Sequence, residues 1–372
     1  MNISLIILII SVLFAILSQR KKVPATDINS GSISYRYYDF NYWFFILSFL
    51  SLMLLCFFSK NGDDIPAYVY YYSNWKISDL LDFSFEVGYK LLCFLLRVVF
   101  RNPYIGIGII KFISIGLFFQ SLYLLRNRIN VGFSVFAYVC ILYTHNFHLL
   151  RIMLAVGIVY LAYAFIILER NKAATVLLFV SVLFHYSSAI VLLAYLAYRL
   201  IGKSLSFNKL IIVSTVLVLV YLNMEFLVKI GVNHLSILSK YSLYISDVES
   251  GSGMAQLVLF IPILYIIITL NKTDMSDKMY ILCSIIGIMS LFAGSLGYIF
   301  EVIGRTTYYF NYFVIVYGAS MPLRKDKVYI NAGFTVFNLR SLLMAVYILI
   351  YLGLTYFIPG KSMEVLTDYQ LF

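Results

Sequence analysis

Charged residues are scarce in this chain of 372 residues, at 12% of the total, while hydrophobic residues make up 62%. The mean hydropathy is +0.91. A soluble domain carries about twice this share of charged residues. The composition therefore excludes a soluble globular protein and predicts a polytopic membrane protein. Because no stretch is long and polar enough to fold alone in water, we expect a single integral-membrane domain over residues 1–372.

Cysteine and histidine are also rare, with four residues of each. The cysteines lie within apolar runs and show neither metal-ligand spacing nor a disulfide pattern, so we interpret them as buried apolar residues. Two histidines share the segment HNFHLL, from His145 to Leu150, but no carboxylate falls in helical register with both. We therefore expect no metal and no cofactor.

The formal net charge of +11 does not predict a nucleic-acid partner, because the basic residues stand in short loops between apolar runs. Such loops are typical of the cytoplasmic side of a membrane protein. The first apolar run is followed, not preceded, by basic residues, which predicts an uncleaved helix with its N-terminus outside. Alternation from there also places the C-terminus outside. The basic loops include 20–22, 126–128 and 324–327.

The apolar runs predict an all-α fold with about 12 transmembrane helices. One further helical run, Glu86 to Asn102, carries Lys90, Arg97 and Arg101, and we expect it to be an outer-leaflet amphipathic or re-entrant helix. It belongs to the first of two predicted outer loops, 59–103 and 224–254. The predicted spans are 3–19, 41–58, 104–125, 131–145, 149–168, 173–185, 187–201, 209–224, 255–271, 279–298, 306–322 and 340–357.

Two arginines, Arg151 and Arg305, each stand beside long apolar runs. A charge next to hydrocarbon is costly and usually faces a protein interior or a water-filled cavity. Each arginine could pair with Asp64 or Glu86 in a structural ion pair, or bind phosphate oxygens with its planar fork. His185 interrupts the apolar run 173–202, where it could be either a buried structural residue or a catalytic one.

In chain order, the segments GDDIPAYVYYY, FEVGYKLL, HNFHLLRIMLAVGIVYLAY, LFHYSSAI and GRTTYYF resemble the EpsG-like branch of the Wzy-type polysaccharide polymerases. The resemblance spans residues 60 to 322. This chain has Ile152 where the family often has a glutamine after the arginine. The residues that match the family's elements are Asp64 and Tyr68, Glu86, Gly88 and Tyr89, Asn146, Arg151 and Ala155, Phe184, His185, Ser187 or Ser188 and Ala189, and Arg305, Tyr309 and Phe310.

This resemblance implies an enzyme of the bacterial cytoplasmic membrane. It would join oligosaccharide repeat units, carried on undecaprenyl pyrophosphate, at the outer face into O-antigen, capsule or exopolysaccharide. The lipid-linked glycan and the bilayer are the implied partners, and a chain-length regulator is a further one. The reaction needs a base for the acceptor hydroxyl and positive charge for the departing pyrophosphate. We assign the base to Glu86, Asp64 or His185, with a preference for Glu86. The positive charge is assigned to Arg151 and Arg305, and sugar binding to Tyr68, Tyr89, Tyr308 and Tyr309.

Two other functions use the same residue types. A flippase or transporter of a lipid-linked sugar would place its charges near the bilayer midplane and on both faces. An O-antigen ligase would differ from a polymerase in its acceptor alone. The predicted clustering of both arginines on the outer side favours an enzyme over a transporter, and it does not separate a polymerase from a ligase.

Overall fold

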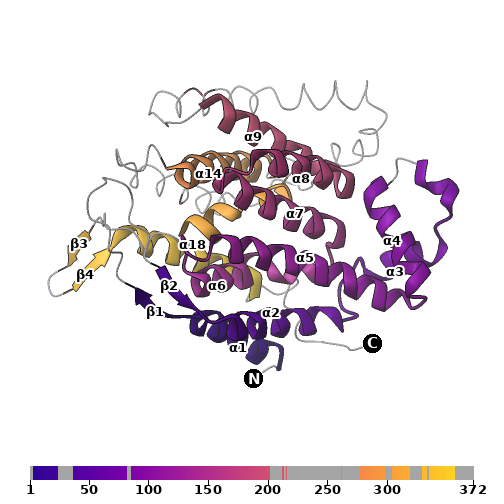
Figure 1. The fold of residues 1–372 in the computed structure, drawn as a ribbon, viewed down its shortest axis with the longest axis horizontal. Coiled ribbons are helices and arrows are strands. Elements are labelled where there is room, and N and C mark those ends of the chain that lie inside the picture. Colours follow the sequence, from indigo (N-terminus) through magenta and orange to yellow (C-terminus); the bar gives the residue numbers. More distant parts are fainter. Residues whose placement is uncertain are drawn as a thin grey trace. The chain divides into compact units, whose positions relative to one another are not determined.

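A computed structural model describes residues 3–23, 37–81, 85–201, 277–297, 304–318, 329–332 and 335–356, together with positions 212, 215 and 261. This described part is predominantly helical, as the sequence predicts (Figure 1). Apart from these three single positions, the predicted spans 209–224 and 255–271 lie outside the described residues, as does the second outer loop, 224–254. The chain forms two compact units, 1–189 with 314–372 and 190–313.

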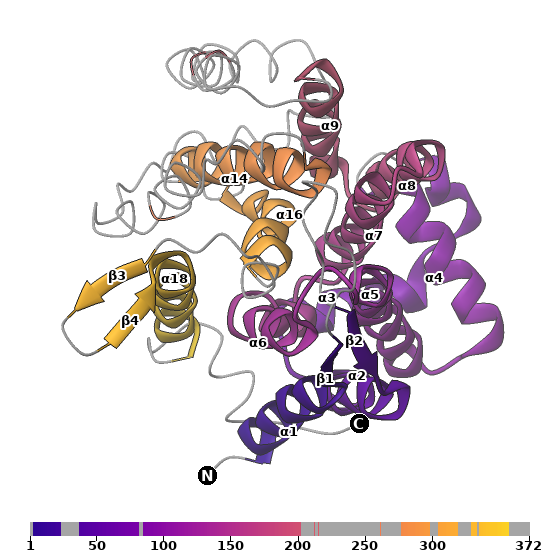
Figure 2. The same ribbon diagram turned by 60° about the vertical axis from the view of Figure 1, so that its left-hand side comes forward.

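The first unit contains most of the described helices. They are α1 (Ile3–Leu17), α2 (Tyr42–Phe57), α3 (Ile65–Asn74), α4 (Val87–Val99), α5 (Pro103–Leu125), α6 (Val131–Ile141), α7 (Leu150–Ile167), α8 (Asn171–Phe184) and α18 (Leu339–Tyr356). Short 3-10 turns join some of them: η1 (Ile77–Leu81), η2 (Tyr143–Phe147) and η3 (Tyr186–Ser188). α5 and α7 lie side by side in its core, and α8 packs on α7 (Figure 2).

The second unit contains α14 (Lys278–Gly297) and α16 (Thr307–Phe310), which pack together. α9 (Ala189–Ile201) begins at the boundary between the units, and the π-helical turn η6 (Phe313–Tyr317) crosses the other boundary. The predicted span 306–322 is thus divided into a short α-helix and a π-helical turn in its described part. The prediction of one integral-membrane domain stays a prediction.

Two small antiparallel ladders were not predicted. β1 (Gln19–Val23) pairs with β2 (Tyr37–Phe40), and β3 (Tyr329–Ala332) pairs with β4 (Thr335–Asn338). β1 contains the basic segment 20–22, and β3 follows the basic segment 324–327; the sequence assigns both segments to cytoplasmic loops. The chain is therefore not purely helical, although the ladders lie outside the helical core of the first unit.

Among the described residues, two helices are long and apolar enough to cross a membrane, Pro103–Leu125 and Leu150–Ile167, and several apolar helices are shorter. α1 exposes large apolar side chains at Ile9, Leu13 and Ile16, and α8 does so at Val176, Phe179 and Leu183. Continuous exposed apolar surface of this kind is typical of helices that face lipid. These features agree with a membrane protein, and the count of about 12 spans stays a prediction.

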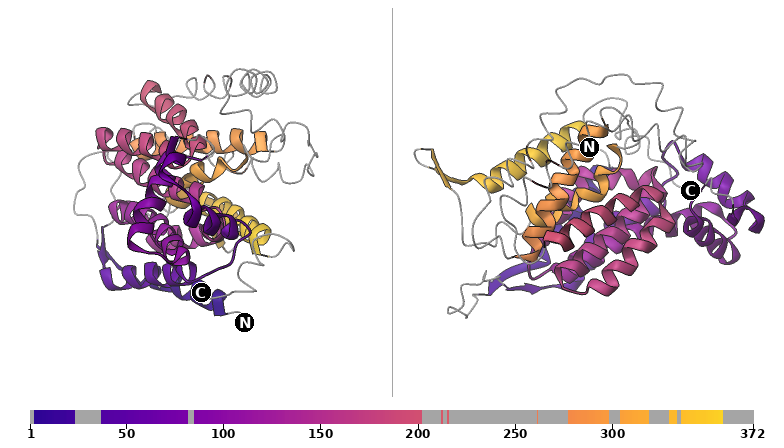
Figure 3. Two further views of the ribbon diagram at one scale, coloured as in Figure 1. Left: turned by 90° about the vertical axis from the view of Figure 1, so that its right-hand side faces the viewer. Right: turned by 90° about the horizontal axis from the view of Figure 1, so that it is seen from above.

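The first outer loop is folded rather than extended. α3 and α4 lie side by side at one end of the first unit (Figures 1 and 3). Arg97 donates to the carbonyl oxygens of Tyr72, Ser73 and Trp75 at 3.1, 3.0 and 2.7 Å, so it caps the C-terminus of α3. Lys90 Nζ donates to the Asp79 carbonyl oxygen at 2.6 Å and is fully buried.

α4 has the amphipathic pattern that the sequence predicts for Glu86 to Asn102. Its exposed face carries Leu91, Leu95, Val98 and Val99, whereas Lys90 and Arg97 turn inward to backbone carbonyls. The helix has 13 residues and is about 20 Å long at 1.5 Å per residue. This is shorter than the hydrocarbon core of a bilayer, as are α6, α8 and α9, so the interfacial or re-entrant position of this run stays a prediction.

Candidate active site

Three helix ends of the first unit meet at a carboxylate. Glu86 is the N-cap residue of α4, Arg151 lies in the first turn of α7, and His185 is the C-cap residue of α8. Glu86 Oε2 accepts from Arg151 Nη1 at 2.6 Å, and Glu86 Oε1 lies 2.8 Å from His185 Nδ1. Of the alternatives that the sequence left open for Arg151, the structure shows the pairing with Glu86.

The carboxylate is enclosed, because 2% of the Glu86 side chain is exposed, compared with 24% for Arg151 and 19% for His185. Both carboxylate oxygens are engaged, and the Tyr186 backbone N–H lies a further 3.4 Å from Oε1. A buried carboxylate is stable only when it is paired and hydrogen-bonded in this way. Glu86 therefore holds the side chains of Arg151 and His185 in place, and both side chains remain partly exposed.

Gly88 explains how α4 reaches the end of α8. A Cβ atom at this position would lie 2.7 Å from the Leu183 carbonyl oxygen and 3.0 Å from the Leu183 carbonyl carbon. Contacts this short do not occur, so a side chain here would push the two backbones apart. Gly88 thus lets the start of α4 lie directly against the end of α8. This close approach brings Glu86 within hydrogen-bond distance of His185.

A Gly88→Ala substitution should therefore separate the helix ends. We expect it to lower the free energy of unfolding by about 1–3 kcal/mol, the usual cost of overpacking. The measurement is the thermal midpoint of the purified protein. Gly116→Ala in α5 is the matched control, since its Cβ would meet its nearest neighbour at 4.0 Å. Equal behaviour of the two variants would contradict this role of Gly88.

Burial raises the pKa of Glu86, but the hydrogen bond with His185 and the charge of Arg151 outweigh burial and lower this pKa to about 2. The carboxylate is then ionised at physiological pH and is a weak proton acceptor. His185 uses Nδ1 toward Glu86, which leaves Nε2 as the ring nitrogen for proton transfer. The arrangement therefore favours His185 over Glu86 as a base, with Glu86 as the residue that orients it.

Arg151 is held on three sides. Its guanidinium carbon lies 4.4 Å from the centre of the Phe85 ring, and its side chain also hydrogen-bonds with Tyr68. The buried Nε atom has no acceptor among the residues that the structure describes. A buried donor without an acceptor costs about 1–3 kcal/mol, and the exposed part of the guanidinium is what a ligand can reach. Fixed orientation, partial exposure and spare donors suit an arginine that binds phosphate.

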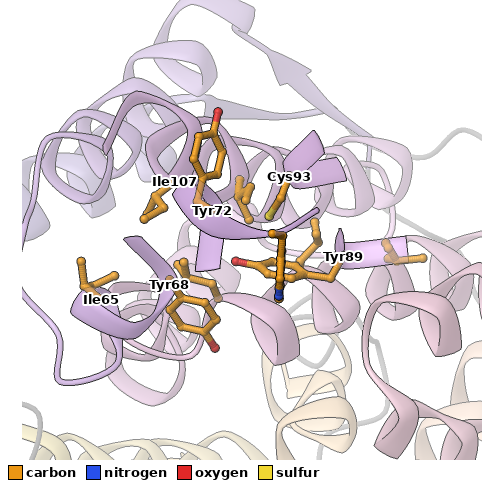
Figure 4. Close-up of a cluster of buried hydrophobic side chains, with 11 residues drawn as sticks. Ile65, Tyr68, Tyr72, Tyr89, Cys93 and Ile107 are labelled. Atoms are coloured by element: carbon orange, nitrogen blue, oxygen red, sulfur yellow. The ribbon is translucent and has the colours of Figure 1, made fainter. Parts of the chain in front are cut away.

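Tyr68 and Tyr89, which the sequence assigns to sugar binding, lie in the protein interior. Their rings meet edge to face with centres 5.9 Å apart. The hydroxyls of Tyr68 and Tyr72 point to opposite sides of this cluster (Figure 4), and that of Tyr72 donates to the Phe100 carbonyl oxygen at 2.8 Å. Neither Tyr68 nor Tyr89 offers an open ring face for a sugar in this structure, and Tyr68 instead supports Arg151.

The other predicted site residues are Asp64, Arg305, Tyr308 and Tyr309. Asp64 precedes α3 and is exposed. Arg305, Tyr308 and Tyr309 belong to the second unit, where Arg305 is exposed, Tyr308 is partly buried and Tyr309 is fully buried. Their predicted roles stay predictions.

Asn146, which the resemblance places in the same element as Arg151, has a structural position. Its Nδ2 donates to the Tyr138 hydroxyl at 2.8 Å and to the Tyr143 carbonyl oxygen at 3.0 Å. Its Oδ1 lies 3.0 Å from the Ser114 hydroxyl of α5. This network holds η2, the turn that leads into α7. It therefore also fixes the position of the first turn of α7, which carries Arg151.

Sequence reasoning did not identify Phe85, and it did not give Lys90 or Arg97 a role. Phe85 was recognisable as the aromatic neighbour of Glu86, but nothing in its spacing indicates that it contacts Arg151. No group of three or more potential metal ligands occurs among the described residues. His145 Nδ1 and His148 Nε2 lie 3.5 Å apart, next to the start of α7.

Comparison with known proteins gives one match. The sequence model of the EpsG family matches residues 41–369, which is most of the chain. No curated protein and no solved structure matches. The family match covers all of the residues in the carboxylate site.

Proposed function

This chain belongs to the EpsG family, and from this premise we propose that it is a membrane glycosyltransferase that polymerises lipid-linked oligosaccharide repeat units. The proposed substrate is the undecaprenyl-pyrophosphate-linked repeat unit, and the proposed location is the outer face of the bacterial cytoplasmic membrane. The product would be O-antigen, capsule or exopolysaccharide. The observation that carries the proposal is the pairing of one buried carboxylate with both an arginine and a histidine.

The proposed reaction forms one bond and breaks another at the anomeric carbon of the growing chain. The acceptor hydroxyl oxygen attacks this carbon, and its proton passes to Nε2 of His185. The bond from the anomeric carbon to the pyrophosphate oxygen breaks, and the lipid pyrophosphate leaves with the electron pair. Glu86 holds His185 in the tautomer with a proton on Nδ1, as the acidic member of a catalytic triad does.

Charge balance supports these roles. The proposed reaction starts with a neutral His185, so the charges of ionised Glu86, Arg151 and this histidine sum to zero. Once His185 has taken the acceptor's proton, the three residues together carry one positive charge. This charge arises as negative charge develops on the departing pyrophosphate, so the site is most favourable for the transition state and not for the substrate.

Arg305 is part of the proposal on the basis of the sequence alone. Its segment GRTTYYF matches the family element that precedes the last helices. We propose that Arg305 also stabilises the anionic substrate, and Arg305→Lys, which keeps the charge but loses the fork, tests this role. A wild-type ladder from this variant at a wild-type protein level would remove Arg305 from the site.

The glycan profile of cells that lack this protein tests the function. We expect the polymer ladder to disappear while single repeat units still reach their final acceptor. Loss of all exported units would instead indicate a flippase, and polymer that accumulates on its lipid carrier would indicate a ligase. Either of these results would overturn the proposed polymerase.

A further inference from the structure

α3 has two faces of different character. Its buried face carries Ile65, Tyr68 and Tyr72, which follow one another at helical spacing. Its exposed face carries Pro66, Ala67, Tyr70, Ser73 and Asn74. The exposed face therefore combines one aromatic ring with a hydroxyl and an amide.

This face differs from the exposed faces of α1, α4 and α8. Those helices expose rows of isoleucine, leucine, valine and phenylalanine, as lipid-facing helices do. α3 exposes Tyr70 at 63% as its one large aromatic side chain, between small and polar neighbours. The two residues before the helix, Asp63 and Asp64, are acidic and exposed. A surface of this composition is suited to water and not to the bilayer core.

A row of ring contacts connects this face to the active site. The Arg151 guanidinium lies over Phe85, and the Phe85 ring centre lies 4.6 Å from that of Tyr71. Tyr71 in turn meets Tyr70 with ring centres 5.7 Å apart and stacks on Trp75 at 5.3 Å. The exposed ring of Tyr70 is thus fixed relative to Arg151 by packed aromatic side chains within one unit.

The amide beside Tyr70 has a defined orientation. Asn74 Nδ2 donates to the Tyr70 carbonyl oxygen at 2.8 Å, so its Oδ1 is the atom left to accept from a ligand hydroxyl. Ser73 Oγ donates to the Val69 carbonyl oxygen at 2.9 Å and likewise retains acceptor capacity. Sugars present an apolar face of C–H groups and a rim of hydroxyl donors, and this surface offers a partner to both.

We propose that the exposed face of α3, formed by Tyr70, Ser73 and Asn74, is a saccharide subsite of the active site. A sugar of the repeat unit would stack on the Tyr70 ring and donate hydroxyl hydrogen bonds to Asn74 Oδ1 and Ser73 Oγ. The inference rests on the proposed function for the substrate class. It moves sugar recognition from the buried rings of Tyr68 and Tyr89 to the neighbouring exposed ring.

The test measures saccharide binding without catalysis. The full-length protein is placed in lipid nanodiscs, and the probe is a lipid-free repeat-unit oligosaccharide released by mild acid from the host cell's own polysaccharide. We expect Tyr70→Ala to weaken its affinity about tenfold, the upper end of what one aromatic contact contributes. Tyr70→Phe should bind within about twofold of the wild type, since the contact uses the ring face. Asn74→Ala should weaken binding less than Tyr70→Ala does.

Trp43→Ala is the matched control, because Trp43 of α2 is a large aromatic side chain that is 77% exposed. It should bind the probe like the wild type. Equal affinities for Tyr70→Ala and the wild type would overturn the subsite. A Tyr70→Ala variant that loses thermal stability in nanodiscs but keeps its saccharide affinity would assign Tyr70 to the membrane interface, and this result would also overturn it.

The same experiment separates this inference from the proposed function. Failure of the wild-type protein to bind the probe, together with an unchanged ladder in cells that lack the protein, would refute the proposed function. A wild type that binds and polymerises, with a Tyr70→Ala variant that does so equally well, would refute the subsite alone.

Discussion

Replacing Glu86 by glutamine should reduce polymer formation at least about a hundredfold, the lower end of what a positioned acid–base group contributes to a rate. The side chain keeps its size but has one oxygen acceptor instead of two. Its NH₂ group must then face a donor, either Arg151 Nη1 or His185 Nδ1. One partner therefore loses its acceptor, and Arg151 loses its counter-charge.

The polymer ladder, normalised to the amount of folded protein in the membrane, measures this effect. Asp63→Asn is the matched control, because it makes the same chemical change at an exposed carboxylate and should leave the ladder unchanged. A Glu86→Gln variant that retains more than half of the wild-type polymer at an equal protein level would exclude Glu86 from the site.

Replacing Arg151 by lysine should also cause a large loss, of about ten- to a hundredfold in polymer formation. Lysine keeps the positive charge, but its single ammonium cannot present the planar set of donors that reaches Glu86, Tyr68 and an anion together. It also loses the flat surface that packs over Phe85. The loss of one bidentate contact to phosphate in the transition state accounts for an effect of this size.

Two measurements separate this effect from simple unfolding. The thermal midpoint of Arg151→Lys should fall by only a few degrees, since the ion pair with Glu86 can re-form. Arg101→Lys, at an exposed position just after α4, is the matched control and should behave like the wild type. A wild-type ladder from Arg151→Lys would mean that positive charge alone is sufficient. This result would contradict the hypothesis that the planar guanidinium of Arg151 binds phosphate through two donors.

The candidate residues of the carboxylate site could be predicted from the sequence, but their pairing could not. Glu86, Arg151 and His185 come from three distant segments, and their residue types and apolar surroundings identified them as candidates. Asp64 and Glu86 stand in the same predicted loop, so the sequence left both as partners of Arg151. The path of the backbone decides between them, because the glycine at 88 brings Glu86 against the end of α8 while Asp64 stays exposed.

The fold of the first outer loop was harder to predict than the spanning helices. Long apolar runs determine the spans, whereas α3 depends on ring packing and on the cap that Arg97 provides from α4. Pro66 in the first turn of α3 is a typical start signal for a helix, and it was available in the sequence. The burial of Tyr68 and Tyr89 has no such signal, since an aromatic residue in a loop can be exposed or buried.

Several lysine and arginine side chains near the predicted outer face point into the protein and not into the solvent. Lys90 and Arg97 of the first outer loop, and Lys111 of α5, donate to the backbone carbonyls of Asp79, Trp75 and Ser59. Lys90 and Lys111 are fully enclosed by protein. Such side chains are not accessible to form ion pairs with lipid headgroups or solutes. The predicted outer side thus presents fewer accessible cations than its residue count suggests, while its carboxylates Asp63 and Asp64 are exposed.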